Sequence, residues 1–392
     1  MRTVTTAERR ARLARRHRLA PGTRTDDVLR ISDDLLALHS SDPATVFLSA
    51  WARMVDPSRE AVETALYEDR TLLRHHVMRR TLWVAGRAMM ARMHAATGRR
   101  VAATEHRRTL KMLTHAGIAD PEAWWDDAAQ QVLATLHDHG PLTTRQVGTL
   151  LPELRRTLES TPGNPKTATI SAHSRVLLQL GFHGRVIRGR PSGAWNNSPY
   201  SWAVTDRWLG TPLPDPTERE ASAELAEAWL HAFGPATATD LQWWMGWTRT
   251  HTRRALADAA AVPVELEGDA ELGWLAADDE AEEPPTEPWV AVLPSLDATT
   301  MGWKQRDWYL SASAADAFDR NGNAGPTLWM DGRVVGAWTQ RRDGELRHLW
   351  FEPVPAGRRR QLTDRLAELR DWLDQTVVTE RFPGRARTAL LA

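Results

Sequence analysis

Apolar side chains recur at helical spacing in two stretches of the chain, residues 124–136 and 219–230, and both stretches end in the same way. Each is followed by a Gly-Pro dipeptide, at Gly140-Pro141 and Gly234-Pro235. Proline cannot continue a helix and glycine tolerates a tight turn, so the dipeptide predicts the end of each helix. The repeated pattern therefore predicts two copies of one local unit.

A threonine shortly after each Gly-Pro pair predicts the start of a second helix. The spacings Thr143-x-x-Gln146 and Thr239-x-x-Gln242 are those of a capping box, in which two side chains satisfy free backbone N–H groups. A helix, a tight turn and a capped second helix form a helix-turn-helix, and a candidate β-hairpin follows each copy. The units are thus predicted to be winged helices, a class that points first to nucleic acid.

The first part of the chain is predicted to be mostly helical and to hold a degenerate third copy. The spacing Thr23-x-x-Asp26 predicts a capped start for a helix that runs through Leu35 to His39. Further helical runs are predicted at residues 7–19, 59–67 and 87–96. Between the last two, the segment 72–84 is expected to become extended at its end, because Thr, Leu, Trp and Val follow one another there.

Beyond residue 288 the pattern changes from helical spacing to alternation. Strands are predicted at 327–330, 334–338 and 346–351, joined at Asp331-Gly332 and Asp343-Gly344. Asp-Gly favours the positive φ of a two-residue hairpin turn. A helix over 356–373 is expected to close this β-rich domain, and the acidic, proline-containing stretch 278–288 before it is interpreted as a linker.

The predicted fold class is mainly α with β, built of tandem winged helix-turn-helix units and a small C-terminal β-barrel or β-meander domain. The predicted boundaries are 1–117 for an N-terminal helical or winged-helix unit, 118–212 for a second winged helix, 213–288 for a third winged helix with the acidic linker, and 289–392 for the β-rich domain with its terminal helix. The hairpin over 182–202 places Arg188 and other arginines between glycines, which suits either a wing along phosphates or a solvated hairpin. Residues 160–165 are expected to form a loop.

Composition narrows the class of protein. The chain has 392 residues, no cysteine and a formal net charge of zero, which excludes disulfides and thiolate metal sites and disfavours a tight non-specific polyanion binder. Lysine occurs only at Lys111, Lys166 and Lys304, so arginine dominates, as expected either for phosphate recognition or for a GC-rich genome. No signal peptide is recognisable and no run approaches the ~20 apolar residues that span a bilayer. A cytoplasmic, nucleoid-associated protein without membrane contact is therefore expected.

The search for catalytic motifs leaves one cluster. Nucleotide-binding loops, dinucleotide fingerprints, zinc-protease motifs and serine-hydrolase motifs are absent from the sequence, so neither a metal nor a cofactor is expected. The remaining cluster is His39-Ser40-Ser41-Asp42-Pro43, directly after the apolar run 35–38. From spacing alone, Ser41 or Asp42 caps the next helix and Pro43 is its first residue.

Two runs at opposite ends of the chain resemble one protein family. The first extends from His39-x-Ser41-Asp42-Pro43 through Trp51-Ala52-Arg53 to Met78-Arg79-x-Thr81-Leu82, and the second from Leu293-Pro294-Ser295-Leu296-Asp297 through Met301-Gly302-Trp303 to Asp331-Gly332-Arg333. Both are similar to the AlkZ/YcaQ-type winged-helix DNA glycosylases, so the resemblance covers nearly the whole chain. It implies tandem winged helices in a C-shape plus a β-barrel. It also implies an enzyme that excises N-alkylated purines from DNA, and several members of the family unhook interstrand crosslinks.

The resemblance also suggests roles for individual residues. The family usually carries Gln-x-Gln or Gln-x-Asp where this chain has His39-Ser40-Ser41, which makes His39 and Ser41 the candidate catalytic pair around an attacking water. A neutral histidine could orient that water and also accept its proton. Asp42 is either a stabiliser of the sugar cation or the helix cap. The candidate DNA contacts, which could instead be solvated or ion-paired arginines, are Arg53, Arg79, Arg80 and Arg188, with Arg79 preferred.

The expected function is therefore a monofunctional DNA glycosylase that acts without metal or cofactor, as a monomer, on double-stranded DNA with alkylated or crosslinked purines. The bond to be hydrolysed is the N-glycosidic bond of N7-alkylguanine or N3-alkyladenine, and crosslink unhooking stays open. Two alternatives remain. One is a non-catalytic winged-helix DNA-binding protein, either a regulator or a lesion-binding shield, and the other is a protein-interaction scaffold.

Overall fold

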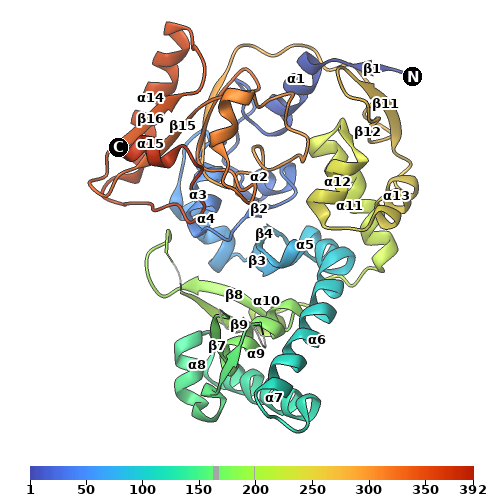
Figure 1. Ribbon diagram of the computed structural model, residues 1–392, viewed down its shortest axis with the longest axis vertical. Helices are drawn as coiled ribbons and strands as arrows, with labels where there is room; N and C mark the ends of the chain where they lie inside the picture. The colour runs from blue at the N-terminus through green and yellow to red at the C-terminus, as the bar shows by residue number, and fades with distance from the viewer. Residues whose placement is uncertain (162–166, 198) are drawn as a thin grey trace.

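The computed structural model describes residues 1–161, 167–197 and 199–392, and it shows a mixed α and β fold. An upper body holds both ends of the chain, and the long helix α6 (Arg99–His115) leads from it to a lower lobe (Figure 1). The lobe contains α7 (Pro121–His139), α8 (Thr144–Leu150) and α9 (Ala172–Phe182). Most of the loop predicted over 160–165 lies outside the described residues.

A six-stranded sheet joins the body to the lobe. Its strands stand in the order β2-β4-β3-β8-β9-β5, and neighbouring strands run antiparallel. The body supplies the first three and the lobe the last three, and Arg74 pairs with Arg188 where the two halves meet. The strands are β2 (Leu38–His39), β3 (Leu72–His76), β4 (Leu82–Gly86), β5 (Leu142–Thr143), β8 (Val186–Pro191) and β9 (Tyr200–Val204).

The N-terminal part departs from the prediction after residue 34. The helix expected to run through to His39 ends early, as α2 (Val28–Asp34), because Leu36 adopts a left-handed backbone with φ of 60° and the next residues pair with β4. Asp27, not Thr23, caps α2 by accepting the Arg30 N–H. The other elements are β1 (Thr3–Val4), α1 (Thr6–Arg16), α3 (Pro43–Trp51), α4 (Arg59–Glu63), η1 (Thr64–Glu68), η2 (Met78–Arg80), α5 (Arg87–Met93) and η3 (His94–Gly98).

The first predicted capping box is confirmed in the lower lobe. The Thr143 hydroxyl accepts the Gln146 N–H at 3.3 Å, and the Gln146 amide oxygen accepts the Thr143 N–H at 2.8 Å. The predicted hairpin is also present, as β8 and β9 after α9. Three short elements separate α8 from α9, namely η4 (Pro152–Arg155), β6 (Thr157–Glu159) and β7 (Thr169–Ser171). Most side chains of α9 are buried, so this helix is covered along most of its surface.

The second copy has the expected order of elements, but its capping box starts two residues earlier than predicted. Thr237 and Asp240 cap α12, whereas Thr239 donates its hydroxyl hydrogen to Glu271 instead of pairing with Gln242. Thr237 ends the short strand β10, so the helix begins as soon as that strand ends. The elements are α10 (Thr205–Leu209), α11 (Glu218–Phe233), β10 (Ala236–Thr237), α12 (Ala238–Met245), α13 (Arg249–Asp258), β11 (Val262–Leu266) and β12 (Gly273–Leu275).

The C-terminal part confirms the predicted strands and terminal helix. β13 (Val290–Leu293), β14 (Thr327–Met330), β15 (Arg333–Gln340) and β16 (Leu346–Trp350) form an antiparallel meander in that order. Asp331 and Gly332 form its first turn with φ of 47° and 81°, as an Asp-Gly turn requires. η5 (Ala312–Ala317) precedes β14, and α14 (Ala356–Leu373) and α15 (Arg387–Leu391) follow β16.

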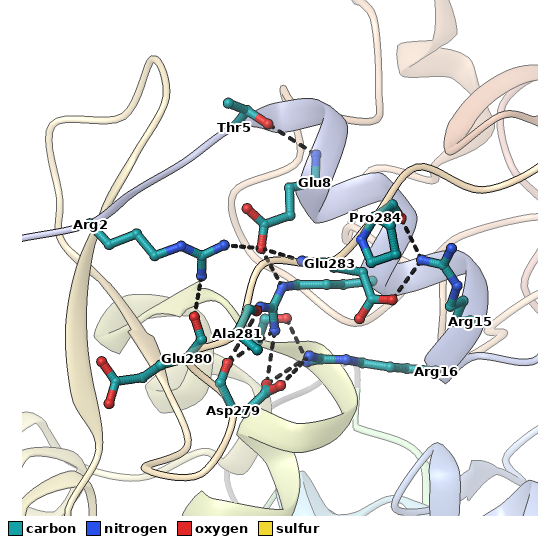
Figure 2. A network of polar contacts seen from close by, with 12 residues as sticks. Arg2, Thr5, Glu8, Arg15, Arg16, Asp279, Glu280, Ala281, Glu283 and Pro284 are labelled. Carbon is teal, nitrogen blue, oxygen red and sulfur yellow. Dashed lines mark hydrogen bonds and ion pairs between the residues drawn. The ribbon is translucent and has the colours of Figure 1, made fainter.

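The acidic stretch 278–288, interpreted from sequence as a linker, is attached to α1 by ion pairs (Figure 2). Asp279 accepts hydrogen bonds from Arg12 at 3.0 Å and from Arg16 at 2.6 Å. Glu283 accepts another from Arg15 at 2.6 Å. Arginines at helical spacing on α1 therefore fix the path of the connection between the second copy and the C-terminal part.

Two large groups of buried apolar side chains stabilise the fold. One extends through the N-terminal part, the helices α11–α13 and the C-terminal strands, and the other lies in the lower lobe together with the end of α6. The body is therefore packed as one unit beside the lobe, whereas the predicted boundaries at 117, 212 and 288 stay predictions. Among the described residues, no helix has the length and apolar character needed to cross a membrane.

Candidate active site

His39 lies at the edge of the six-stranded sheet, where β2 pairs with β4. It stands opposite Trp83, and the two rings meet edge to face with their centroids 4.7 Å apart. Only 7% of His39 is exposed. Burial, together with the positive charge of Arg79, lowers the pKa of His39 to about 3. The imidazole is therefore neutral at physiological pH.

One hydrogen bond joins His39 to the backbone of Ser41, two residues further along the chain. The backbone N–H of Ser41 donates to His39 Nδ1 at 3.3 Å. Because Nδ1 is the acceptor, the neutral ring carries its hydrogen on Nε2 and can donate it. Ser41 is partly exposed, and its hydroxyl makes no hydrogen bond to any other described residue. The pair thus presents one N–H donor and one hydroxyl.

Asp42 is the helix cap in this structure. One carboxylate oxygen accepts the Ala44 N–H at 3.2 Å at the start of α3, and the other accepts the Arg381 N–H at 2.9 Å. Burial raises the pKa of Asp42 despite these hydrogen bonds. The side chain is 3% exposed, and its bonds fix the chain after Ser41. This geometry favours the capping role over the stabilisation of a sugar cation.

Arg79 lies beside His39, at the turn between β3 and β4, with a left-handed backbone (φ 52°). Its guanidinium lies 4.8 Å from the ring centroid of Trp243 on α12, and Arg306 lies 5.5 Å from the same ring. Burial, together with the charge of Arg306, lowers the pKa of Arg79 to about 10. Arg79 therefore joins a site to which three distant segments contribute.

Sequence reasoning missed Trp243 and Arg306. The sequence signal for Trp243 is the adjacent Trp244. Adjacent side chains of a helix point about 100° apart, so the two tryptophans cannot both lie on one buried face. Trp244 is buried at 1% exposure, whereas Trp243 is only partly buried. No local pattern marks Arg306, which lies in an irregular segment of the C-terminal part.

The other predicted DNA-contacting arginines have different environments. Arg80, next to Arg79, has 57% of its side chain exposed and pairs with Glu105 at 3.2 Å. Arg188 lies 3.4 Å from the ring centroid of Trp202, and burial lowers its pKa to about 9. A DNA contact remains a prediction for both.

The prediction for Arg53 is wrong, because its side chain has no exposed surface. It forms a two-pronged ion pair with Asp297 of the C-terminal part, at 2.8 and 2.9 Å. Arg53 belongs to the first of the two runs that resemble the family, and Asp297 belongs to the second. Their ion pair therefore joins the N-terminal and C-terminal parts inside the core.

Comparison with known protein families identifies the family of this chain. The family described as "DNA glycosylase AlkZ-like" matches residues 33–372, which is most of the chain. The chain belongs to the AlkZ-like DNA glycosylase family. The matched region includes His39, Ser41, Arg79 and Trp243, and it also includes the buried pair between the two ends.

Among solved structures, the DNA glycosylase AlkZ of Streptomyces sahachiroi is similar in fold. The TM-score is 0.74 at 19% identity, and the match covers 98% of this chain and 99% of that one. A search of curated proteins finds no match. Within the described residues, no group of three or more His, Asp or Glu side chains is arranged to hold a metal ion.

Proposed function

We propose that this protein is a monofunctional DNA glycosylase that hydrolyses the N-glycosidic bond of N7-alkylguanine and N3-alkyladenine, including purines in interstrand crosslinks. Membership of the AlkZ-like family supports the reaction class. The observation that carries the proposal to this site is the neutral His39, whose Nδ1 accepts the backbone N–H of Ser41. The partner is double-stranded DNA, bound by a monomer.

Hydrolysis of this bond needs little help from a general base on the protein. Alkylation at N7 or N3 makes the purine cationic, so it departs as a neutral base and leaves an oxocarbenium-like sugar. A neutral water molecule can attack such a carbon when it is held in position. His39 Nε2–H would donate a hydrogen bond to the oxygen of that water, and the Ser41 hydroxyl would accept one from it. As the C–O bond forms, the oxygen becomes positively charged, and it then releases one proton to the solvent.

This arrangement changes the role expected for His39. A general base acts best when its pKa lies near the working pH, and a pKa of about 3 is far below it. In addition, Nδ1 already accepts the Ser41 N–H. We therefore infer that His39 orients the water as an amide would and does not take its proton.

The finer features of the fold belong to the same proposal. The units α7–α8–α9 with β8 and β9, and α11–α12–α13 with β11 and β12, have the element order of winged helices. We propose that they support a C-shaped, DNA-binding surface around the site. Arg79 and Arg80 are the proposed contacts to phosphates beside the lesion.

Base release from a duplex with one 7-methylguanine, followed by alkaline cleavage, tests the proposal under single-turnover conditions. His39→Ala should lower the rate at least ~100-fold, as removal of one positioned donor does elsewhere. His39→Gln should recover much of it, because an amide N–H can replace Nε2–H. Ser41→Ala tests the second partner, and Ser313→Ala, at an exposed position of η5 in the C-terminal part, is the matched control.

Each outcome decides between the candidates. Base release that is lost in His39→Ala, with the thermal transition and the affinity for undamaged duplex unchanged, supports the enzyme. Tight binding of the damaged duplex without base release by the wild type would overturn it in favour of a lesion-binding shield. A crosslinked duplex in the same assay shows directly whether unhooking occurs.

A further inference from the structure

The solvent face of α6 is strongly basic. Arg100, Arg107 and Lys111 are exposed and lie near one another because they recur at helical spacing. Between them the exposed positions are the small residues Ala103 and Thr104. Among the described residues, the Arg107 guanidinium donates only to the Thr104 hydroxyl, at 3.3 Å, and Lys111 makes no ion pair.

The helix has a single acidic residue, and that residue is already surrounded by arginines. Glu105 is buried with 4% of its side chain exposed, and it pairs with Arg175 at 2.9 Å. Arg80 lies 3.2 Å and Arg108 3.8 Å from its other oxygen. One carboxylate therefore faces three guanidinium groups, and this part of the surface keeps an excess of positive charge.

Two contacts of Gly246 connect this basic face to the candidate active site. Arg100 donates to the carbonyl of Gly246 at 2.6 Å, at the end of α12. A Cβ atom on Gly246 would lie 3.2 Å from the side chain of Arg79, so Arg79 packs against the same glycine. Arg80 follows Arg79 and reaches Glu105 on α6. Arg100, at the start of the basic face, thus lies against the same glycine as the side chain of Arg79.

We propose that the exposed face of α6 binds the phosphate backbone of duplex DNA next to the lesion. The proposal rests on the proposed function only in taking DNA as the partner. Arg100 to Lys111 extend over roughly 16 Å at 1.5 Å per residue, a length along which one strand presents about five phosphates. The small side chains at Ala103 and Thr104 let the backbone approach the helix.

The competing surface is α13, the third helix of the second copy. Arg249 and Arg253 are exposed there and form no ion pair with any described residue. The structure favours α6 because its cations are connected to Arg79 by the contacts above. A test must therefore separate the two helices.

Affinity for an undamaged, labelled 20-base-pair duplex, measured by fluorescence anisotropy over a series of KCl concentrations, separates them. The double variant R107E/K111E should bind at least tenfold more weakly, and the slope of log K against log salt should fall by about 2, which is about one per lost phosphate contact. The matched control is R342E/R360E, which reverses two exposed arginines of the C-terminal part. It should stay within about twofold of the wild type.

An affinity and salt slope of R107E/K111E equal to those of R342E/R360E would overturn the proposal. If R253E weakens binding and R107E/K111E does not, the duplex lies on α13, and the proposal for α6 is overturned as well. Because the probe carries no lesion, the measurement does not depend on catalysis. Failure of base release by the wild type would refute the glycosylase function and leave the assignment of the α6 surface intact.

Discussion

Replacing Arg53 by methionine removes a charge from a buried polar site in which every hydrogen-bond donor of the guanidinium has a partner. The five N–H groups of the guanidinium all donate: Nε to the His17 carbonyl, Nη1 to the Ser49 carbonyl and to Asp297, and Nη2 to Asp297 and the Thr299 hydroxyl. Asp297 also accepts the Ser49 hydroxyl at 2.6 Å and the Thr299 N–H at 2.9 Å. Neither side chain has exposed surface.

The magnitude follows from what the substitution leaves behind. Methionine fills much of the arginine volume, so the cavity is small, but Asp297 would remain as a buried charge without its partner. Removing one member of such a pair typically costs about 3–5 kcal/mol of unfolding free energy. Burial alone would raise the pKa of Asp297, and the charge and hydrogen bonds of Arg53 now hold it below its usual range. In R53M, that pKa should rise.

Urea unfolding followed by tryptophan fluorescence measures the loss, and R53M/D297N should recover part of it because no charge is then buried. Arg107→Met, on the exposed face of α6, is the control for loss of a surface arginine and should change the free energy of unfolding by less than about 0.5 kcal/mol. A stability of R53M within 1 kcal/mol of the wild type at pH 7, combined with weaker DNA binding, would refute the structural role. It would restore Arg53 as a DNA contact.

Three further outcomes follow from local features. Burial lowers the pKa of His17 and of His75 to about 3, below the ordinary value of 6.5, so the unfolded state binds more protons than the folded state below pH 6.5. Each histidine should therefore lower the free energy of unfolding by about 1.4 kcal/mol per pH unit as the pH falls from 6.5 toward 3. Urea midpoints from pH 7 to 5 measure this dependence, and His75→Gln should make its slope smaller. Thr143→Ala should cost about 1 kcal/mol in the same assay because the capping box with Gln146 is lost. The single-turnover rate of base release should show no step near pH 6.5, since His39 stays neutral, and a step there in the wild type that is absent in His39→Gln would contradict that assignment.

Features that depend on local sequence could be predicted. The helix expected over 356–373 has those limits as α14, and the Asp331-Gly332 turn joins two strands that lie where alternation placed them. The capping box at Thr143 formed because both partners and both N–H groups lie within one turn of the chain. The second box moved to Thr237 because a strand that pairs with β12 ends there, and this pairing involves residues far along the chain.

The same distinction explains which parts of the site could be found from sequence. The run Leu35 to Leu38 is apolar throughout, so its periodicity cannot separate a helix from a buried strand, and pairing with β4 decides the outcome. The motif that spaces His39 and Ser41 two residues apart makes them candidates, but it does not determine the protonation state of the imidazole.

That state is set by residues from elsewhere in the chain. An exposed histidine would titrate near pH 6.5 and would carry a positive charge for part of the physiological range. Trp83 covers the ring of His39, and Arg79, placed by its contact with Trp243 in the second copy, adds a positive charge that opposes protonation. The neutral state of His39 over the whole physiological range therefore depends on burial in the folded body and on the position of Arg79, two features that the local motif does not contain.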